Sequence, residues 1–233
     1  MNGMVKTAAV AAMAGAMAGA TAETTAAAAE AGATAGATAA AEAGVTAPAS
    51  RQAEQDTIVP AGFGTLRQDD VTMTLRSGPL LIKVTPLAEP IIRLLAPDTY
   101  QRLRNLAASK RTEASRTGGL AEPAMFMVSF FSYQPDVEYV AEDLQFSHQG
   151  NLQGPIAVLP VTPAFGRQRL AQQDQQVAVY AFNLRVDYQL PIVIRYGLEQ
   201  SDQWVNIIPK LEVERAKVRA RARGKASQRE RKA

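Results

Sequence analysis

The pattern of apolar and polar positions changes at about residue 57. From there on, short apolar runs alternate with joints rich in Pro, Gly and Asn. Residues 71–75 alternate apolar and polar side chains, which is the period of a strand with one buried face. Residues 76–79 are turn formers, and residues 80–85 are again largely apolar. These segments predict a β-hairpin.

Further apolar runs follow at regular spacing. Residues 125–132 include apolar side chains at both odd and even positions, as in a strand that is covered on both faces. The other predicted strands are residues 144–147, 156–161, 177–186, 192–196 and 204–208. Because only one predicted helix is available to connect parallel strands, we expect antiparallel pairing. The pattern predicts a mainly β fold, an antiparallel β-sandwich of immunoglobulin-like architecture without the Cys–Trp–Cys pattern of true immunoglobulin domains.

One part of the chain has helical periodicity. Its apolar positions recur at spacings of three and four residues: Leu94, Leu95, Tyr100, Leu103 and Leu106. Pro97 interrupts this pattern, and proline is best tolerated in the first turn of a helix. We therefore predict a short turn over residues 90–95 and a single helix over 97–109. The polar residues 110–119 are expected to form a mobile loop.

The first 22 residues have the three parts of an export signal. Lys6 supplies a positive start, residues 7–21 carry no charge, and Ala20-Thr21-Ala22 offers small residues for cleavage. The chain is therefore predicted to be exported, to the periplasm or outside the cell, after cleavage of a signal peptide (1–22) near Ala22. An alternative is that the segment stays uncleaved and tethers an accessory subunit to a membrane. An Ala-rich cytosolic tail is a further alternative.

The next segment predicts a spacer. Of the 44 residues between Thr7 and Ser50, 23 are Ala, and the first Leu of the chain is Leu66. Such a segment cannot bury enough apolar surface to offset the entropy lost on ordering. We expect a disordered Ala/Gly/Thr-rich spacer over 23–56 and a folded domain over 57–213.

The composition excludes several chemistries. The chain of 233 residues has no Cys and one His. The lack of Cys rules out disulfides, thiolate metal sites and cysteine nucleophiles, and the single His rules out sites with several histidine ligands. We therefore predict no cofactor and no metal site, and we identify no small-molecule substrate.

Two weak candidates for catalysis remain. His148 could act with Ser129 or Ser132, but the G-x-S-x-G pattern is missing, and we interpret His148 as a surface turn residue. Asp136 and Glu138 could form a carboxylate pair, or they could be the solvated charges of a sheet edge. The edge interpretation is preferred, and an exported hydrolase using either arrangement is kept as an alternative function.

The positive charge is concentrated at the C-terminus. Residues 210–233 hold ten basic and three acidic side chains, whereas residues 51–209 hold 14 basic and 16 acidic ones. In a predicted basic tail (214–233), four cations alternate with apolar residues: Lys217, Arg219, Arg221 and Arg223. An extended chain would carry all four on one side, whereas a helix, which the composition favours, spreads them around its axis. These four residues are the predicted polyanion-binding set, and a solubilising terminus is the alternative.

Together these features predict an exported, non-catalytic cell-envelope protein that serves as an interaction, scaffold or accessory module. Its partner would be a protein, an anionic envelope polymer or a membrane surface. Nucleic acid is not expected, because export separates the chain from chromosomal DNA and no aromatic residues are interleaved in the tail to stack on bases.

Overall fold

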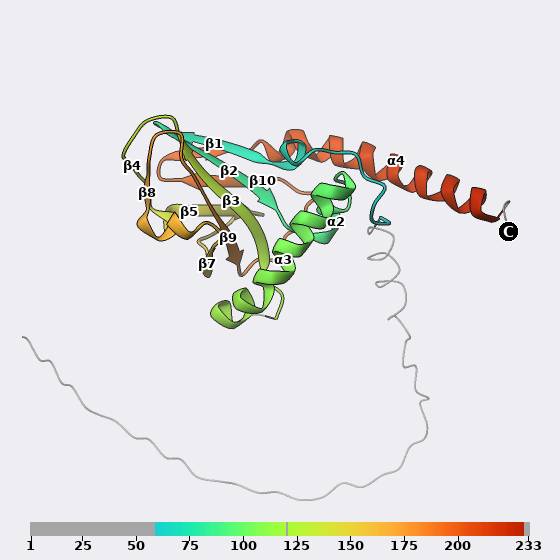
Figure 1. Cartoon of the computed structure of the whole chain (residues 1–233), viewed down its shortest axis with the longest axis horizontal. Helices are drawn as coiled ribbons and strands as arrows, with labels where there is room; N and C mark the ends of the chain where they lie inside the picture. Colours follow the sequence, from blue (N-terminus) through green and yellow to red (C-terminus); the bar gives the residue numbers. More distant parts are fainter. Residues whose placement is uncertain (1–58, 120, 231–233) are drawn as a thin grey trace, which may run out of the picture. The chain divides into compact units, whose positions relative to one another are not determined.

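The computed structural model describes residues 59–119 and 121–230, which belong to one compact unit (Figure 1). The predicted signal peptide (1–22) and spacer (23–56) lie outside the described residues. The described part is mostly antiparallel β-structure, as predicted, and it ends in a long helix.

The largest sheet is antiparallel, with strand order β1-β2-β3-β9-β7. Its strands are β1 (Met73–Ser77), β2 (Leu80–Pro86), β3 (Ala124–Ser132), β7 (Ala157–Pro160) and β9 (Gln175–Phe182). The predicted hairpin is confirmed as β1 and β2, which pair from Met73 with Val84 to Ser77 with Leu80. The strand that is apolar on both faces, β3, lies in the middle of this sheet. Its alternate side chains can therefore pack on opposite faces.

Two smaller sheets complete the β-structure. The four-stranded sheet has the order β11-β10-β5-β6, formed by β5 (Leu144–His148), β6 (Asn151–Gln153), β10 (Ile192–Tyr196) and β11 (Glu199–Ser201). The two-stranded sheet pairs β4 (Val137–Glu138) with β8 (Arg169–Leu170). Short 3-10 helices precede or connect the strands: η1 (Gln68–Val71) lies before β1, η2 (Ala141–Asp143) between β4 and β5, and η3 (Pro163–Arg167) between β7 and β8.

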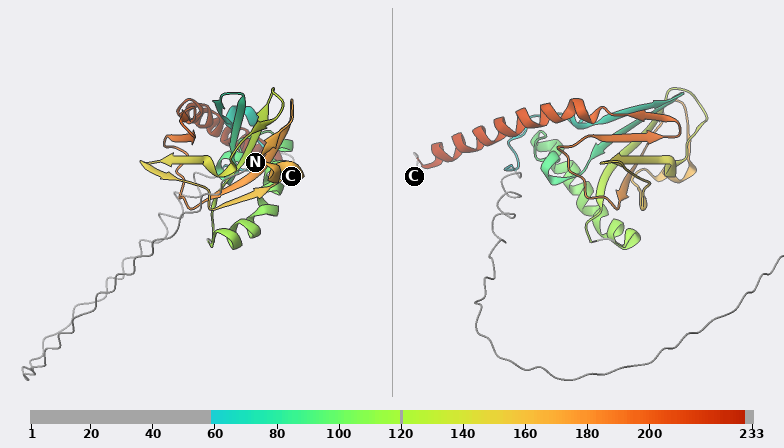
Figure 2. Two further views of the ribbon diagram at one scale, coloured as in Figure 1. Left: turned by 90° about the vertical axis from the view of Figure 1, so that its left-hand side faces the viewer. Right: turned by 180° about the vertical axis from the view of Figure 1, so that it is seen from behind.

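Aromatic side chains of the two larger sheets meet in the core. Phe126 on β3 lies 4.4 Å from Phe146 on β5, between ring centroids, and packs edge-on against Phe182 of β9 at 5.8 Å. All three rings are fully buried. Burial of one such side chain stabilises the fold by about 1.5–3 kcal/mol. Figure 2 shows the strands of the two sheets from the end and from behind.

The predicted helix over 97–109 is longer than the sequence indicated. After the short α2 (Glu89–Ile92), α3 runs from Pro97 to Gly118, so the prediction of a loop over 110–119 is wrong. The polar end of α3 stays helical because Ala114 is buried against the domain and Lys110 pairs with Glu113 at 3.1 Å. The helix ends where Gly119 adopts a φ of +66°, a left-handed conformation that glycine adopts without steric cost.

The predicted strand over 204–208 and the prediction of a single helix are also wrong. Residues 204–230 form one helix, α4 (Trp204–Glu230), and the predicted boundary between domain and tail at residues 213 and 214 falls inside it. The buried apolar side chains of α4 recur three, four and seven residues apart: Trp204, Ile207, Leu211 and Val218. That spacing is the period of a helix with one apolar face. The β-branched residues near its start and Pro209 in its interior hide this period in a local reading.

Candidate anion-binding helix

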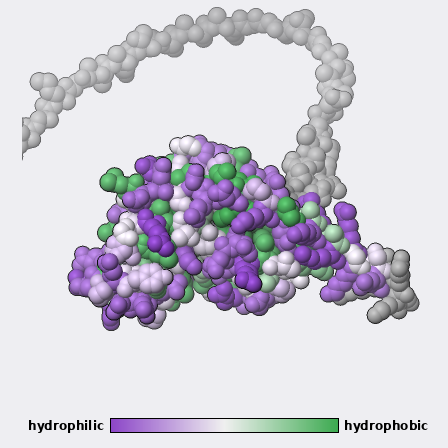
Figure 3. Space-filling model, turned by 90° about the horizontal axis from the view of Figure 1, so that it is seen from above, coloured by the Kyte–Doolittle hydropathy of each residue, from purple (hydrophilic) through white to green (hydrophobic). Residues whose placement is uncertain are grey.

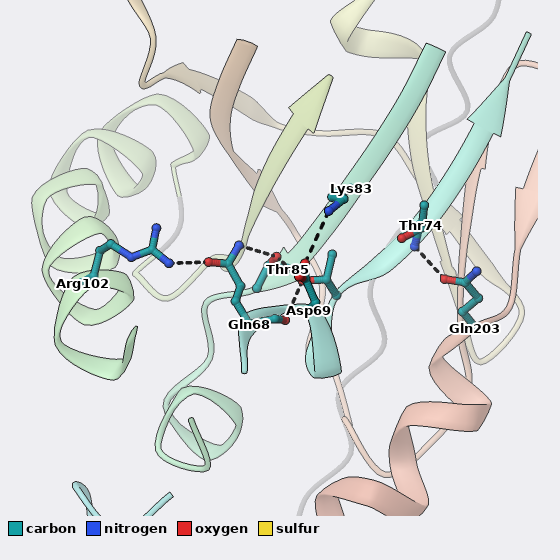
Figure 4. Close-up of polar contacts among 8 residues, drawn as sticks. Gln68, Asp69, Thr74, Lys83, Thr85, Arg102 and Gln203 are labelled. Carbon is teal, nitrogen blue, oxygen red and sulfur yellow. Dashed lines mark hydrogen bonds and ion pairs between the residues drawn. The ribbon is translucent and has the colours of Figure 1, made fainter. Parts of the chain in front are cut away.

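The N-terminal half of α4 is anchored to the β-structure. Trp204 is fully buried, donates its Nε1–H to the carbonyl oxygen of Tyr188 at 3.1 Å, and packs edge-on against the Tyr188 ring at 5.9 Å. Directly before the helix, the Gln203 side-chain oxygen accepts a hydrogen bond of 2.8 Å from the backbone N–H of Thr74 on the edge strand β1 (Figure 4). These contacts fix where α4 begins and in which direction it points.

A buried carboxylate fixes the middle of the helix. The side chain of Glu214 is 4% exposed and accepts three hydrogen bonds through Oε1. Two come from the backbone N–H and the hydroxyl of Thr65, at 3.0 and 2.9 Å, and one from Arg221 Nη1 at 2.8 Å. Burial alone raises the pKa of Glu214, but the hydrogen bonds and the charge of Arg221 outweigh it, so the pKa lies below its usual value. Glu214 is therefore a charged structural group.

The segment before η1 is held between α4 and the residues that follow α2. A Cβ on Gly64 would lie 2.2 Å from the carbonyl carbon of Leu94, so only glycine allows this close approach. On the other side, Arg221 Nη1 also donates to the carbonyl oxygen of Phe63 at 2.7 Å, and Lys225 Nζ lies 5.3 Å from the Phe63 ring centroid. This clamp ties α4 to the body of the domain as far as Lys225.

The four predicted polyanion-binding residues do not share one environment. All four lie on α4 with exposed side chains, and the helical form spreads them around the axis, as the composition indicated. Arg221 is engaged by Glu214 and the Phe63 carbonyl, so its charge is already balanced. Lys217, Arg219 and Arg223 are exposed and extend the positive surface along the helix.

Two further cations of α4 were missed by the sequence reasoning. Lys225 extends the exposed basic surface by two residues beyond the predicted set. Arg215 is different, because it is buried and its Nε has no hydrogen-bond partner among residues 59–119 and 121–230. Burial lowers the pKa of Arg215, and the charge of Arg219 acts in the same direction. The helical period of the buried apolar residues places Arg215 beside the buried face of α4. This position can be inferred from the sequence only when residues 204–230 are recognised as a helix.

The charged residues in the second half of α4 are all basic. Between Arg215 and Arg229 the sequence has seven basic residues and no acidic one. Figure 1 shows that this half of α4 extends beyond the sheets, and the space-filling view of Figure 3 shows mainly hydrophilic residues on the face it presents. Such a surface attracts anions at a range set by the salt concentration, about 10 Å at 0.1 M.

His148 is not the surface turn residue that the sequence predicted. It is 3% exposed in β5, where its Nδ1 lies 3.2 Å from the carbonyl oxygen of Pro191 and its Nε2 accepts a hydrogen bond from the backbone N–H of Asp187 at 3.2 Å. Pairing of β5 with β10 places the imidazole there, because His148 is opposite Ile192. The hydroxyl of Ser132 instead donates to the carbonyl oxygen of Gln134. The structure brings no serine hydroxyl into hydrogen bonding with His148 within the described residues.

The carboxylates of the β4 segment meet a cation. Arg169 on β8 contacts Asp136 at 2.8 Å and Glu138 at 2.9 Å, and all three side chains are more than half exposed. Tyr139, beside them in a cleft of about 360 Å³, donates its hydroxyl to the side-chain oxygen of Gln176 at 2.6 Å. Burial, followed by the charge of Asp174, raises the pKa of Tyr139, so this hydroxyl stays a donor. A guanidinium that bridges both carboxylates leaves no open acid–base pair there.

No group of three or more His, Asp or Glu side chains is placed to bind a metal ion within residues 59–119 and 121–230. In the same part of the chain, none of the helices has the length and apolar character that crossing a bilayer requires. The chain matches none of the protein families, curated proteins or solved structures with which it was compared.

Proposed function

We propose that this chain is an exported, non-catalytic protein of the cell envelope, and that its β-rich domain presents α4 to an anionic surface. The observation that carries the proposal is the run from Arg215 to Arg229, which has no acidic residue and lies on a helix clamped to the domain. Its exposed cations outside the Glu214 pair include Lys217, Arg219, Arg223 and Lys225. An anchored helix holds its cations in place, so binding an anion costs less ordering entropy than it would for a flexible tail. The anion would be an envelope polymer or a membrane surface.

The proposal treats the two larger sheets as a β-sandwich of immunoglobulin-like architecture. In support, rings of β3, β5 and β9 lie within 4.4–5.8 Å of one another. Such a sandwich is a rigid platform, on which a projecting helix keeps its orientation.

Export rests on the predicted signal peptide. Amino-terminal sequencing of the mature protein checks it, with Glu23 expected as the first residue after cleavage near Ala22, or Thr21 after cleavage at the alternative site Ala18-Gly19-Ala20. A mature chain that still begins at Met1 contradicts the cleaved form and favours the alternative, a membrane-tethered subunit.

The binding proposal is tested by removing exposed cations of α4 that lie outside the Glu214–Arg221 pair. In the full chain, Lys217→Gln, Arg219→Gln and Arg223→Gln are combined, and Arg221 is left in place because it pairs with Glu214. A cation near an anionic lipid surface contributes about 1 kcal/mol, so three changes should weaken binding to phosphatidylglycerol vesicles by about 100-fold. Lipopolysaccharide is the second probe. Deleting the chain after Lys210 is a poorer test, because it also removes the buried Leu211, Glu214 and Val218.

The matched control removes three exposed arginines from other elements: Arg76→Gln, Arg111→Gln and Arg167→Gln. It changes the net charge by the same amount, so we expect vesicle binding close to that of the wild type. Equal loss in both variants would show that net charge alone acts, and unchanged binding in the α4 variant would overturn the proposal. Circular dichroism and thermal unfolding verify that both variants fold.

A further inference from the structure

The outer face of the five-stranded sheet carries a small pocket at one end. Cross-strand pairing places Leu81, Phe131 and Gln175 in one row across β2, β3 and β9, and Lys83, Ser129 and Val177 in the next row. Alternation along β3 directs Phe131 and Ser129 to this face and the core residues Phe126 and Phe130 to the other. The pocket has a volume of about 190 Å³, and its lining consists of Leu81, Lys83, Ser129, Phe131, Tyr133 and Gln175.

The other end of the same sheet is covered. Helix α3 packs against β7 and β9, and Ile156, directly before β7, lies so close to Gly118 that a Cβ on this glycine would come within 2.4 Å of it. Leu159 and Val179, which pair across β7 and β9, are buried there. Tyr133, at the pocket, is instead 63% exposed. Within the described residues, α3 therefore covers the β7–β9 end of this sheet face and leaves the pocket uncovered.

The pocket contains a polar group without a partner. Ser129 is 5% exposed and lines the pocket, and its hydroxyl takes part in no hydrogen bond among the described residues. The hydroxyl is not among the enclosed side-chain atoms without a partner in the described residues, so it is open to the pocket and can exchange hydrogen bonds with water or with a ligand. A ligand with hydroxyl groups would supply the missing partner.

The charge of the pocket is close to neutral. Lys83, its one ionic residue, lies 3.4 Å from Asp69 of η1 (Figure 4). The remaining polar groups are a serine hydroxyl, the Tyr133 phenol and the Gln175 amide, each of which both donates and accepts hydrogen bonds. Phe131 and Tyr133 add two rings in edge-to-face contact, 4.6 Å between centroids. Rings beside neutral donors and acceptors fit a ligand that is apolar on one face and rich in hydroxyls at its edge.

We propose that this pocket, the β2–β3–β9 pocket, binds one neutral pyranose unit of a polysaccharide. The C–H face of the sugar ring packs on Tyr133 and Phe131, and its hydroxyls exchange hydrogen bonds with Ser129 and Gln175. The volume of 190 Å³ is below the 300–1,000 Å³ range of pockets that enclose drug-sized ligands, so a single ring is a suitable occupant. This site is separate from α4 and gives the domain a second, uncharged contact with an envelope.

The experiment is saturation-transfer NMR on the full chain with three neutral probes: cellohexaose, maltohexaose and N-acetylchitohexaose. We expect transfer to the ring protons of at least one probe. Tyr133→Ala should weaken its binding at least about tenfold, and Ser129→Ala should weaken it by a smaller factor. Leu198→Ala, at an exposed apolar side chain between β10 and β11, is the control and should leave binding unchanged.

No transfer from any probe at millimolar concentration would overturn the proposal, as would equal loss in the Leu198 control. Sedimentation of the free protein distinguishes a different occupant: a dimer that Tyr133→Ala converts to monomer would mean that a second copy of the chain covers the pocket, and would also overturn it. The α4 triple variant should bind the sugar normally, so failure of this site and failure of the anion-binding proposal are distinguishable.

Discussion

The two long helices of the described chain use their charges differently. Helix α3 mixes both signs, and two of its five cations lie near carboxylates: Lys110 pairs with Glu113, and Arg104 lies 3.8 Å from Glu89. Helix α4 has one buried carboxylate, Glu214, which engages Arg221, and no acidic residue from there to Arg229. The comparison indicates that nearby carboxylates balance part of the positive charge of α3, whereas the second half of α4 has no acidic residue of its own.

The largest effect is expected when the contacts that anchor α4 through Trp204 are removed. Trp204→Ala deletes a fully buried indole and its hydrogen bond to Tyr188, and such a deletion costs about 3–5 kcal/mol. We expect a loss of this size in the free energy of unfolding, measured with urea, and weaker vesicle binding because α4 is no longer held. Val205→Ala, at the half-exposed neighbour, should change stability by less than about 0.5 kcal/mol. Equal effects of both substitutions would contradict the proposed anchor.

A smaller change removes the clamp in the middle of α4. Glu214→Gln keeps the size of the side chain but loses charged hydrogen bonds to Arg221 and Thr65, and should cost about 1.5–3 kcal/mol at neutral pH. The exposed Glu212→Gln is the control, with a change within about 0.5 kcal/mol.

The pH dependence of this difference has a definite sign. The pKa of Glu214 is lowered in the folded chain, so its contribution is complete above the ordinary value of 4.5 and declines as the pH falls through the folded value. The stability gap between wild type and Glu214→Gln should therefore be widest above pH 4.5 and narrow in acid. A gap that widens as the pH falls would contradict the assignment of a charged Glu214.

The smallest effect is expected on α3. Lys110→Ala removes one partly exposed pair with Glu113, and such pairs contribute about 0.2–0.5 kcal/mol. Thermal unfolding should show this small loss, and vesicle binding should not change. A marked loss of vesicle binding would mean that the cations of α3 also contact the anionic surface.

Much of the fold could be predicted from the sequence because its signals are local. Alternation and turn residues identified the β1–β2 hairpin, and the apolar run of β3 indicated a central strand. The helix α4 could not be found in this way, because Pro209 and the β-branched residues before it suggest a strand until Leu211 and Val218 are included. The polar end of α3 is helical only because Ala114 packs against the rest of the domain, a tertiary contact that no local pattern contains.

The candidate sites could be predicted less well than the fold, because they are formed by contacts between residues far apart in the sequence. The four cations on α4 were found from composition, but the engagement of Arg221 required Thr65 and Phe63, which are 156 and 158 residues away in the sequence. The turn residues Gln149 and Gly150 after His148 predict an exposed side chain, whereas its burial follows from the pairing of β5 with β10. The β2–β3–β9 pocket needed the register of three strands before Ser129, Phe131 and Gln175 became neighbours.

The central claim is that α4, and not α3, faces the anionic surface. Because the chain has no Cys, a fluorophore can be placed at one position, through Ser227→Cys on the exposed end of α4 or Thr112→Cys on the exposed side of α3. The measurement is quenching by spin-labelled headgroups in phosphatidylglycerol vesicles. The account predicts strong, salt-sensitive quenching at position 227 and little at position 112. Equal quenching at both positions, or stronger quenching at 112, would contradict it.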